Sequence, residues 1–477
     1  MSDTNGNGKH GDIVVVIPRG EVIRNFVYTG ALDEVAEDSG VSLLSVLPSD
    51  ELTELLVKRY QKVLHLENYP ERWIVRILRE ILEIAHGRWL WSNAAQERWR
   101  LRDVEADTTG KKLKRWTKKL ACYPFANRTG LHLLSRAERA TSRWFRTTDE
   151  FVRLFKELKP SLVFNGSHVH SSVAIQSIQA AQWLGIPTAT FIFSWDNLTS
   201  QGRILPSYDY YLVWNEAIRD QLLDIYKEIR PEQIFITGTP QFDFHFQPEF
   251  YWTREKFCAQ VGADPSRPII LYTTGMANHM PGEPSIVESI ADLLRDMTDL
   301  GSPQLLVRVY PKDQTGRFEE LKVRRTDILF SKTHWEKAWH TPRFEDCYML
   351  TNSVRHADIG INVASTISLE LCMFNKPVIN VGYNPPEVDR GSIDYARYYE
   401  FDHYRPVVES GAVRVAGSEI EMHALLRSAL AEPQKDSAER RKLIRQMFGN
   451  TLDGQASHRV AAQLVNLAQR PEWSLCQ

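Results

Sequence analysis

Short apolar runs alternate with helical segments along most of this 477-residue chain. Residues 13–17 read IVVVI and are bounded by Pro18 and Gly20, which is typical of a buried parallel strand. A helical segment follows, and SLLSVLP at 42–48 completes a βαβ unit. Similar strands are predicted within 161–167, 187–193, 208–216, 233–240, 268–275, 305–311 and 327–332. This alternation favours an α/β fold built on parallel sheets.

The alternation occurs in two successive series, so we predict two Rossmann-like, doubly wound parallel-sheet domains that face a cleft. The first domain is expected at residues 1–245 and the second at 246–477. Residues at about 50–160 differ, because Arg, Lys, Leu and Trp recur there at roughly helical spacing. We interpret them as a helical insert in the first domain.

The bulk composition excludes several classes of protein. Lys and Arg number 58 against 60 Asp and Glu, so no overall charge favours nucleic-acid binding. The five cysteines are scattered, odd in number and without a CxxC pair, which argues against a disulfide framework or zinc site. The polar N-terminal segment MSDTNGNGKHGD resembles a disordered lead-in without a signal-peptide core. With no apolar run of about 18 residues, we expect a cytoplasmic protein.

A compact basic run, KKLKRWTKK at 111–119, encloses Trp116 within the insert. One interpretation is a surface that contacts anionic lipid headgroups or a polyanionic acceptor. The simpler one, which the sequence favours, is a solvated helix face. If the first interpretation holds, the run at 111–119 contacts the inner face of the membrane.

Residues 357–383 carry the most informative pattern: an apolar strand, a polar turn, a helix and a second apolar strand. Ser365 and Thr366 stand where the helix begins, and Glu370 follows about one turn later. Backbone N–H groups and hydroxyls at a helix start favour an anion such as a diphosphate. The Glu370 carboxylate is placed to bind ribose hydroxyls. The alternative is an ordinary N-cap followed by a surface glutamate.

Two other strand ends of the second domain carry candidate phosphate-binding residues. Thr274 and Gly275 close one strand, and a hydroxyl beside a glycine suits a phosphate-proximal turn. Arg308 and Lys312 flank the end of the next strand and are candidates to offset diphosphate charge. Charged strand ends are also common on ordinary surfaces.

In the first domain, polar residues follow two strands in the same way. Asn165 and His168 end one strand, and His168 is a candidate general base or hydrogen-bond donor. Asp196 is a second candidate base, in a loop that also carries Asn197 and Arg203. The competing interpretation is that Asp196 and Asn197 cap a turn. We expect Asn165, Asn197 and Arg203 near an acceptor.

The chain lacks GxGxxG after its first strand, a GxxxxGK[ST] loop, GxSxG and HExxH. It also lacks a DxD doublet after an apolar strand, where a metal-dependent nucleotide-sugar enzyme would place one. We therefore expect no cofactor and no metal, with helix ends, hydroxyls and cations stabilising the leaving group.

Several segments of the chain resemble the GT-B class of transferases. The similarity is strongest in DIGINVASTISLELCMFNKPVINVGY, and extends to RNFVYTGALDEVA, FSWDNLTSQGR, YLVWNE and FITGTPQFD. These segments are similar to enzymes near CDP-glycerol glycerophosphotransferases and UDP-N-acetylglucosamine 2-epimerases. The resemblance implies that Ser365 and Thr366 bind the donor diphosphate and Glu370 its ribose. VRVYPKD departs from the Arg-x-His-Pro motif of the glycerophosphotransferases, since Tyr310 replaces the histidine.

The sequence thus predicts a metal-independent glycosyltransferase that moves a sugar from a nucleotide-diphosphate donor to a surface-glycan or lipid-linked acceptor. Three alternatives stay open. One is a nucleotide-sugar epimerase, and another is a CDP-glycerol-type phosphotransferase. The third is a non-catalytic relative that binds a glycan or partner through its insert.

Overall fold

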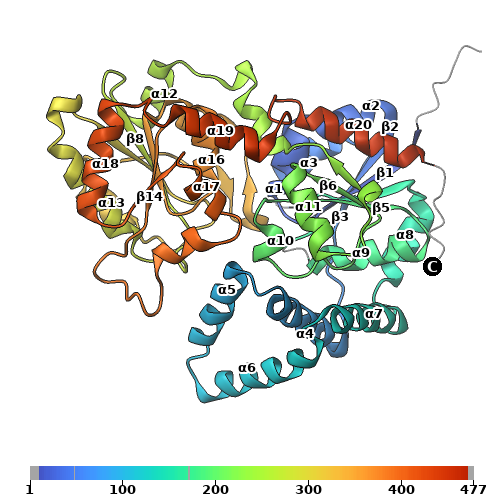
Figure 1. Cartoon of the computed structure of the whole chain (residues 1–477). Helices are drawn as coiled ribbons and strands as arrows, with labels where there is room; N and C mark the ends of the chain where they lie inside the picture. The colour runs from blue at the N-terminus through green and yellow to red at the C-terminus, as the bar shows by residue number, and fades with distance from the viewer. Residues whose placement is uncertain (1–9, 48, 170–171, 471–477) are drawn as a thin grey trace, which may run out of the picture. The chain divides into compact units, whose positions relative to one another are not determined.

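The computed structural model describes residues 10–47, 49–169 and 172–470, and these residues form two compact units (Figure 1). Unit 1 runs to Asp243 and takes in the C-terminal segment from Thr451, whereas unit 2 is the stretch Phe244–Asn450. The structure thus differs from the predicted division at 245/246, because the chain returns to unit 1 after Asn450. The expected N-terminal lead-in lies largely outside the described residues.

Unit 1 is built on a seven-stranded parallel sheet of order β3-β2-β1-β4-β5-β6-β7. Strands β2, β4, β5 and β6 are buried along their whole length, as the uninterrupted apolar runs indicated. The sequence missed β3, which lies inside the predicted insert. The strands are β1 His10–Ile17, β2 Ser39–Ser45, β3 Lys62–His65, β4 Leu162–Asn165, β5 Thr188–Phe191, β6 Tyr210–Val213 and β7 Ile234–Ile236.

The helices of this sheet domain connect successive parallel strands, and the last one, α20, packs against α2, β1 and β4. They are α1 Glu21–Ile23, α2 Ala31–Asp38, α3 Asp50–Arg59, α8 Asp149–Leu158, α9 Ser172–Trp183, α10 Asn197–Ser200, α11 Glu216–Ile225 and α20 Ala456–Gln469. A π-helical turn, η1 Arg24–Tyr28, and the 3-10 turns η3 Pro231–Gln233 and η4 Pro240–His245 complete it. We call η4 the connector, since the unit boundary falls within it.

Four helices between β3 and α8 form the insert: α4 Trp73–Leu90, α5 Asn93–Val104, α6 Thr109–Cys122 and α7 Arg128–Trp144, with η2 Tyr123–Phe125. Figure 1 shows α4, α5 and α6 as three sides of a triangle, with α7 beside α4. The insert has a small core of its own around Leu82, Cys122 and Leu131. It is therefore shorter than the predicted 50–160, because α3, β3 and α8 belong to the sheet domain.

Unit 2 contains a six-stranded parallel sheet of order β10-β9-β8-β13-β14-β15. Its strands are β8 Ile269–Thr273, β9 Gln304–Arg308, β10 Leu329–Phe330, β13 Ile359–Asn362, β14 Val378–Val381 and β15 Arg414–Ala416, beside a hairpin of β11 Trp335–Glu336 and β12 Thr341–Pro342. Its helices are η5 Pro248–Phe250, α12 Arg254–Val261, α13 Glu283–Arg295, η6 Thr298–Leu300, α14 Glu319–Arg324, η7 Ala338–His340, α15 Phe344–His356, α16 Ile367–Met373, η8 Tyr395–Glu400, α17 Arg405–Glu409, α18 Glu419–Ala431 and α19 Ser437–Phe448.

Both sheets reverse their strand order beside their first strand, between β1 and β4 in unit 1 and between β8 and β13 in unit 2. The connections on the two sides of such a reversal leave in opposite directions, which opens a crevice at the carboxyl ends of the strands. The predicted fold class, two Rossmann-like parallel-sheet domains with a helical insert in the first, is confirmed.

Candidate functional site

The turn after β13 stands at the strand-order reversal of unit 2. It carries Ser365 and Thr366, both half-buried, between the end of the strand and the start of α16. Thr366 is the N-cap residue of α16, yet its side chain makes no capping hydrogen bond. The two hydroxyl residues therefore have a place beside the crevice that a ligand of a doubly wound sheet normally occupies.

A network of buried amide and hydroxyl groups hydrogen-bonds to the backbone of this turn. Oδ1 of Asn362 accepts hydrogen bonds from the Ser365 N–H at 3.1 Å and from the Asn380 side chain at 3.1 Å. The Tyr404 hydroxyl donates to Oδ1 of Asn380 at 2.9 Å, and its oxygen lies 2.8 Å from Oγ of Ser368. Since Asn362, Ser368, Asn380 and Tyr404 are all fully buried, the network fixes the turn in one geometry.

Ala364, directly before the turn, has φ of 38°, in the left-handed region. A non-glycine residue in this region costs of order 1–3 kcal/mol, and such strain clusters at ligand sites. The Asn362 network offers the compensating contacts. No pattern in the sequence indicated this strained residue.

Glu370 lies on α16 one turn after Thr366 and is 8% exposed. Its Oε2 is 2.7 Å from Nε2 of His245, whose Nδ1 lies 3.2 Å from the Thr351 hydroxyl. Because an ionised carboxylate only accepts hydrogen bonds, Nε2 is the donor. The carboxylate predicted to bind ribose is thus held by a histidine of the connector, which the sequence analysis did not identify.

Thr274 and Gly275 follow β8, the strand next to β13, but their polar groups already have partners. Oγ1 of Thr274 accepts from the Tyr310 N–H at 2.8 Å, and the Gly275 N–H donates to both carboxylate oxygens of Glu283. Burial raises the pKa of Glu283 to about 7 against the opposing effect of Arg317. A Cβ at Gly275 would come within 2.1 Å of Sδ of Met280, so close packing explains this glycine.

Arg308 ends β9 and is 5% exposed. Its Nη2 binds both carboxylate oxygens of Asp346, at 2.8 and 3.0 Å, and Asp346 also accepts from the Trp335 indole. Nη1 of Arg308 is buried and makes no hydrogen bond with any described residue. Lys312 lies beside the Tyr310 ring, with Nζ 6.0 Å from its centroid. Arg308 is therefore a cation held in place by Asp346, which binds one of its three guanidinium nitrogens.

In unit 1, the two candidate bases lie after neighbouring strands. Nδ1 of His168, after β4, is 3.2 Å from the carbonyl oxygen of Phe191 at the end of β5. Asp196 follows β5, is half-buried, and accepts from the Ser200 hydroxyl through Oδ2 at 2.5 Å. The structure brings both residues to the carboxyl edge of one sheet, as the strand pattern predicted, and their catalytic roles stay predictions.

The residues expected near an acceptor make structural contacts. Asn165 is fully buried and donates to the Tyr208 hydroxyl at 2.8 Å. Asn197 is 5% exposed and accepts from the Ser194 N–H at 2.8 Å, which matches the turn-capping interpretation. Arg203 pairs with Glu228 at 2.7 Å and stacks on the Tyr226 ring. Asn197 and Arg203 belong to the loop after β5, whereas Asn165 ends β4.

Arg19, which follows β1 at the reversal of the unit 1 sheet, escaped the sequence analysis. It pairs with Glu21 and lies over the Phe193 ring, 5.2 Å from its centroid. A Cβ at Gly166, after β4, would lie 2.4 Å from Cγ1 of Val22. This glycine is needed because α1 packs directly against the end of β4.

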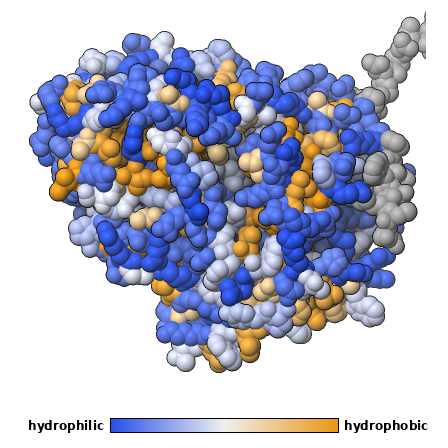
Figure 2. All heavy atoms as spheres, viewed as in Figure 1, coloured by the Kyte–Doolittle hydropathy of each residue, from blue (hydrophilic) through white to orange (hydrophobic). Residues whose placement is uncertain are grey.

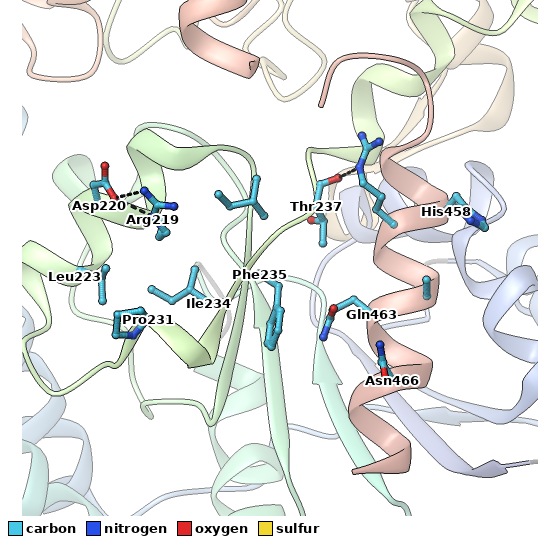
Figure 3. A pocket seen from close by; sticks show the side chains of 13 residues that line it. Arg219, Asp220, Leu223, Pro231, Ile234, Phe235, Thr237, His458, Gln463 and Asn466 are labelled. Atoms are coloured by element: carbon cyan, nitrogen blue, oxygen red, sulfur yellow. Dashed lines mark hydrogen bonds and ion pairs between the residues drawn. The ribbon is translucent and has the colours of Figure 1, made fainter. Parts of the chain in front are cut away.

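A separate groove of about 800 Å³ lies on unit 1 between α11, the edge strand β7 and α20 (Figure 3). Arg219 and Asp220 stand on one side, whereas Arg459 reaches the Thr237 carbonyl oxygen from the other. None of the residues predicted from the sequence lines it. Among the described residues, no three His, Cys, Asp or Glu side chains are grouped to hold a metal ion.

Comparisons with known proteins concern the fold. No protein-family model matches the chain, and no curated protein matches its sequence. The structure is similar to UDP-GlcNAc 2-epimerase from Neisseria meningitidis bound to UDP-GlcNAc, with a TM-score of 0.53, 12% identity and coverage of 95% of this chain and 99% of that one. A glycosyltransferase from Rickettsia africae gives a TM-score of 0.51 and 13% identity, over 97% of this chain and 100% of the other.

A putative UDP-N-acetylglucosamine 2-epimerase from Listeria monocytogenes is also similar, with a TM-score of 0.52 at 12% identity over 97% of this chain and 99% of that one. These similarities run through both sheet domains. They show that the chain has the GT-B fold, as its sequence motifs predicted.

Proposed function

We propose that unit 2 binds a nucleotide-diphosphate sugar at the carboxyl ends of β8 and β13. The observation that carries this proposal is the strand order, which reverses between β8 and β13 where the Ser365–Thr366 turn begins. Ligands of doubly wound sheets bind at such a reversal. The buried network under the turn supports the proposal, because it holds the backbone of the turn that carries the two hydroxyls before any ligand arrives.

In this proposal each group has one role. The hydroxyls of Ser365 and Thr366 bind the diphosphate, and Glu370 accepts hydrogen bonds from the ribose hydroxyls. Arg308 and Lys312 offset the negative charge that grows on the departing diphosphate. No metal or cofactor is invoked.

We further propose that the chain is a glycosyltransferase whose acceptor binds unit 1. His168 or Asp196 takes the proton from an acceptor hydroxyl, whose oxygen then attacks the anomeric carbon of the donor sugar. The bond from that carbon to the diphosphate breaks, and the nucleotide diphosphate leaves with the electron pair. The acceptor is a surface glycan or a lipid-linked glycan.

Calorimetry with UDP, CDP, GDP, ADP and dTDP tests the donor site. We expect one of them to bind, and Ser365→Ala/Thr366→Ala to weaken that binding about tenfold or more, or about 1.4 kcal/mol. Glu421→Gln on α18, an exposed carboxylate of unit 2, is the control and should bind as the wild type does. Equal affinity of the double variant and the wild type would remove the turn from the site.

A nucleotide-sugar epimerase is the second candidate, and it is favoured by the similarity to a UDP-GlcNAc 2-epimerase from Neisseria meningitidis and a putative one from Listeria monocytogenes. An epimerase converts the donor without any acceptor, whereas a transferase requires one. An NMR time course with UDP-GlcNAc distinguishes them: a second sugar epimer without acceptor supports the epimerase, and donor turnover only after a glycan acceptor is added supports the transferase.

A further inference from the structure

Helix α6 has an inverted distribution of side chains. Its charged residues Arg115 and Lys119 face the protein, where they bind Asp103 at 2.8 and 2.6 Å, and Lys118 pairs with Glu80. Cys122 on the same face is buried in the core of the insert. The inward face of a surface helix is ordinarily the apolar one, so α6 leaves its apolar residues on the other side.

That other side presents a continuous apolar stripe. It is made of residues spaced three and four apart, which share one face of a helix. All four are 52 to 62% exposed: Leu113, Trp116, Leu120 and Tyr123. Lys112 and Lys114, also exposed, flank the stripe, and their ammonium groups make no ion pair with any described residue.

The insert is strongly basic although the chain as a whole is not. Residues 73–144 contain sixteen Lys and Arg but only seven Asp and Glu, whereas the entire chain has 58 and 60. In Figure 2, hydrophobic and hydrophilic surfaces alternate over the insert, at the bottom of the view. The exposed stripe of Trp, Leu and Tyr is flanked by lysines and belongs to a basic insert. Such a surface is complementary to one that has an apolar interior under negatively charged groups.

We propose that α6 docks on a bilayer that contains anionic lipid. The stripe enters the boundary between headgroups and acyl chains, as interfacial amphipathic helices do, with Trp116 at the depth that indole rings prefer. Lys112 and Lys114 bind lipid phosphates at its edges. The helix lies on the membrane, since no described helix is long and apolar enough to cross one. This proposal stands independently of the nucleotide site.

Sedimentation of the full chain with vesicles tests it. We expect the wild type to bind vesicles of phosphatidylcholine with phosphatidylglycerol at least tenfold better than phosphatidylcholine alone, and to be released by 0.5 M salt. Because these two comparisons use the wild type, no folding defect of a variant affects them. Equal binding to both vesicles, or binding to neither, overturns the proposal.

Two variants locate the contact. Leu113→Ser/Trp116→Ser/Leu120→Ser removes the stripe, and Lys112→Glu/Lys114→Glu reverses the flanking charge; each should lose at least tenfold in binding. The matched controls in unit 2 are Val323→Ser/Ile420→Ser, at sites 83 and 84% exposed, and Lys442→Glu. Controls that weaken binding as much as the α6 variants would refute the assignment to α6.

Two further results would contradict the lipid proposal and indicate a different binding partner for α6. Retention on heparin without any vesicle binding would indicate a soluble polyanion. A dimer in light scattering that dissociates in the stripe variant, again without vesicle binding, would indicate a second copy of the chain. Unchanged melting temperatures and circular dichroism of the variants show that they fold.

Discussion

Nε2 of His245 donates a hydrogen bond to Oε2 of Glu370 across 2.7 Å, and both side chains are almost completely buried. The bond joins the connector to α16. Two residues earlier, the Asp243 carboxylate accepts from the N–H groups of Ala456 and Ser457 at the start of α20. One short turn is therefore anchored in unit 2 by its histidine and in unit 1 by its aspartate.

We predict that His245 positions Glu370 for the ribose. His245→Ala leaves a buried carboxylate without its donor, so nucleoside diphosphate affinity should fall about tenfold, whereas His245→Gln should retain part of it. Calorimetry with a ribonucleotide and its 2′,3′-dideoxy analogue provides the measurement. The loss should appear for the ribonucleotide only, and an equal loss for both would indicate a general structural effect.

The network under the Ser365 turn predicts a graded loss of stability. Asn380→Leu removes the hydrogen bonds that Asn380 makes to Asn362, to Ser368 and to the Tyr404 hydroxyl, so the free energy of unfolding should fall by about 3 kcal/mol. Tyr404→Phe removes one hydroxyl and should cost about 1 kcal/mol. Urea unfolding of both variants provides the test, and a reversed order of the two would contradict the network.

Gly360 in β13 allows α16 to lie close to the sheet. A Cβ there would come within 2.0 Å of Cδ1 of the buried Leu371, so Gly360→Ala should destabilise the protein by about 1–3 kcal/mol. Leu371→Ala opens space for the new methyl. The double variant should consequently be more stable than the sum of the two single effects predicts, and simple additivity would show that the two residues do not meet.

His86 predicts a loss of stability in acid. It is fully buried on α4 beside the Trp89 and Tyr226 rings, and both ring nitrogens lack a partner among the described residues. Burial, assisted by Arg203 and Arg98, lowers its pKa from 6.5 to about 3. Below pH 6.5 His86 is therefore protonated in the unfolded chain but stays neutral in the folded one. The free energy of unfolding consequently falls as the pH drops.

The effect amounts to about 2 kcal/mol between pH 7 and pH 5. His86→Phe keeps the ring packing and cannot titrate, so its unfolding free energy should change about 2 kcal/mol less over this interval. His132→Gln, at an exposed site on α7, is the control and should follow the wild type. A His86→Phe profile parallel to the wild type would assign the acid sensitivity to other groups.

Local patterns predicted the elements well, because an apolar run and its flanking turn are properties of neighbouring residues. The stretch from β13 to β14, with Ser365 and Thr366 between strand and helix, follows from that pattern alone. Polar partners far along the chain could not be predicted. Arg308 was expected to face phosphate, yet Asp346, thirty-eight residues later, holds one of its nitrogens.

His245 escaped prediction for the same reason, since 125 residues separate it from Glu370. The basic run at 111–119 was recognised, but the sequence could not show which face of the helix turns inward. That choice depends on Asp103 and Glu80, which pair with Arg115 and Lys118. Periodicity predicts that a helix is two-faced, whereas tertiary contacts decide the direction of each face.

The return of the chain to unit 1 at Thr451 makes the two units unequal for protein engineering. Residues 244–450 are one uninterrupted piece that a single gene fragment encodes. The remainder needs α20, which covers β1 and β4 from the opposite end of the sequence. A truncation after Asn450 would strip one face of the first sheet, so unit 1 alone should be produced with a short linker that bridges Asp243 to Thr451.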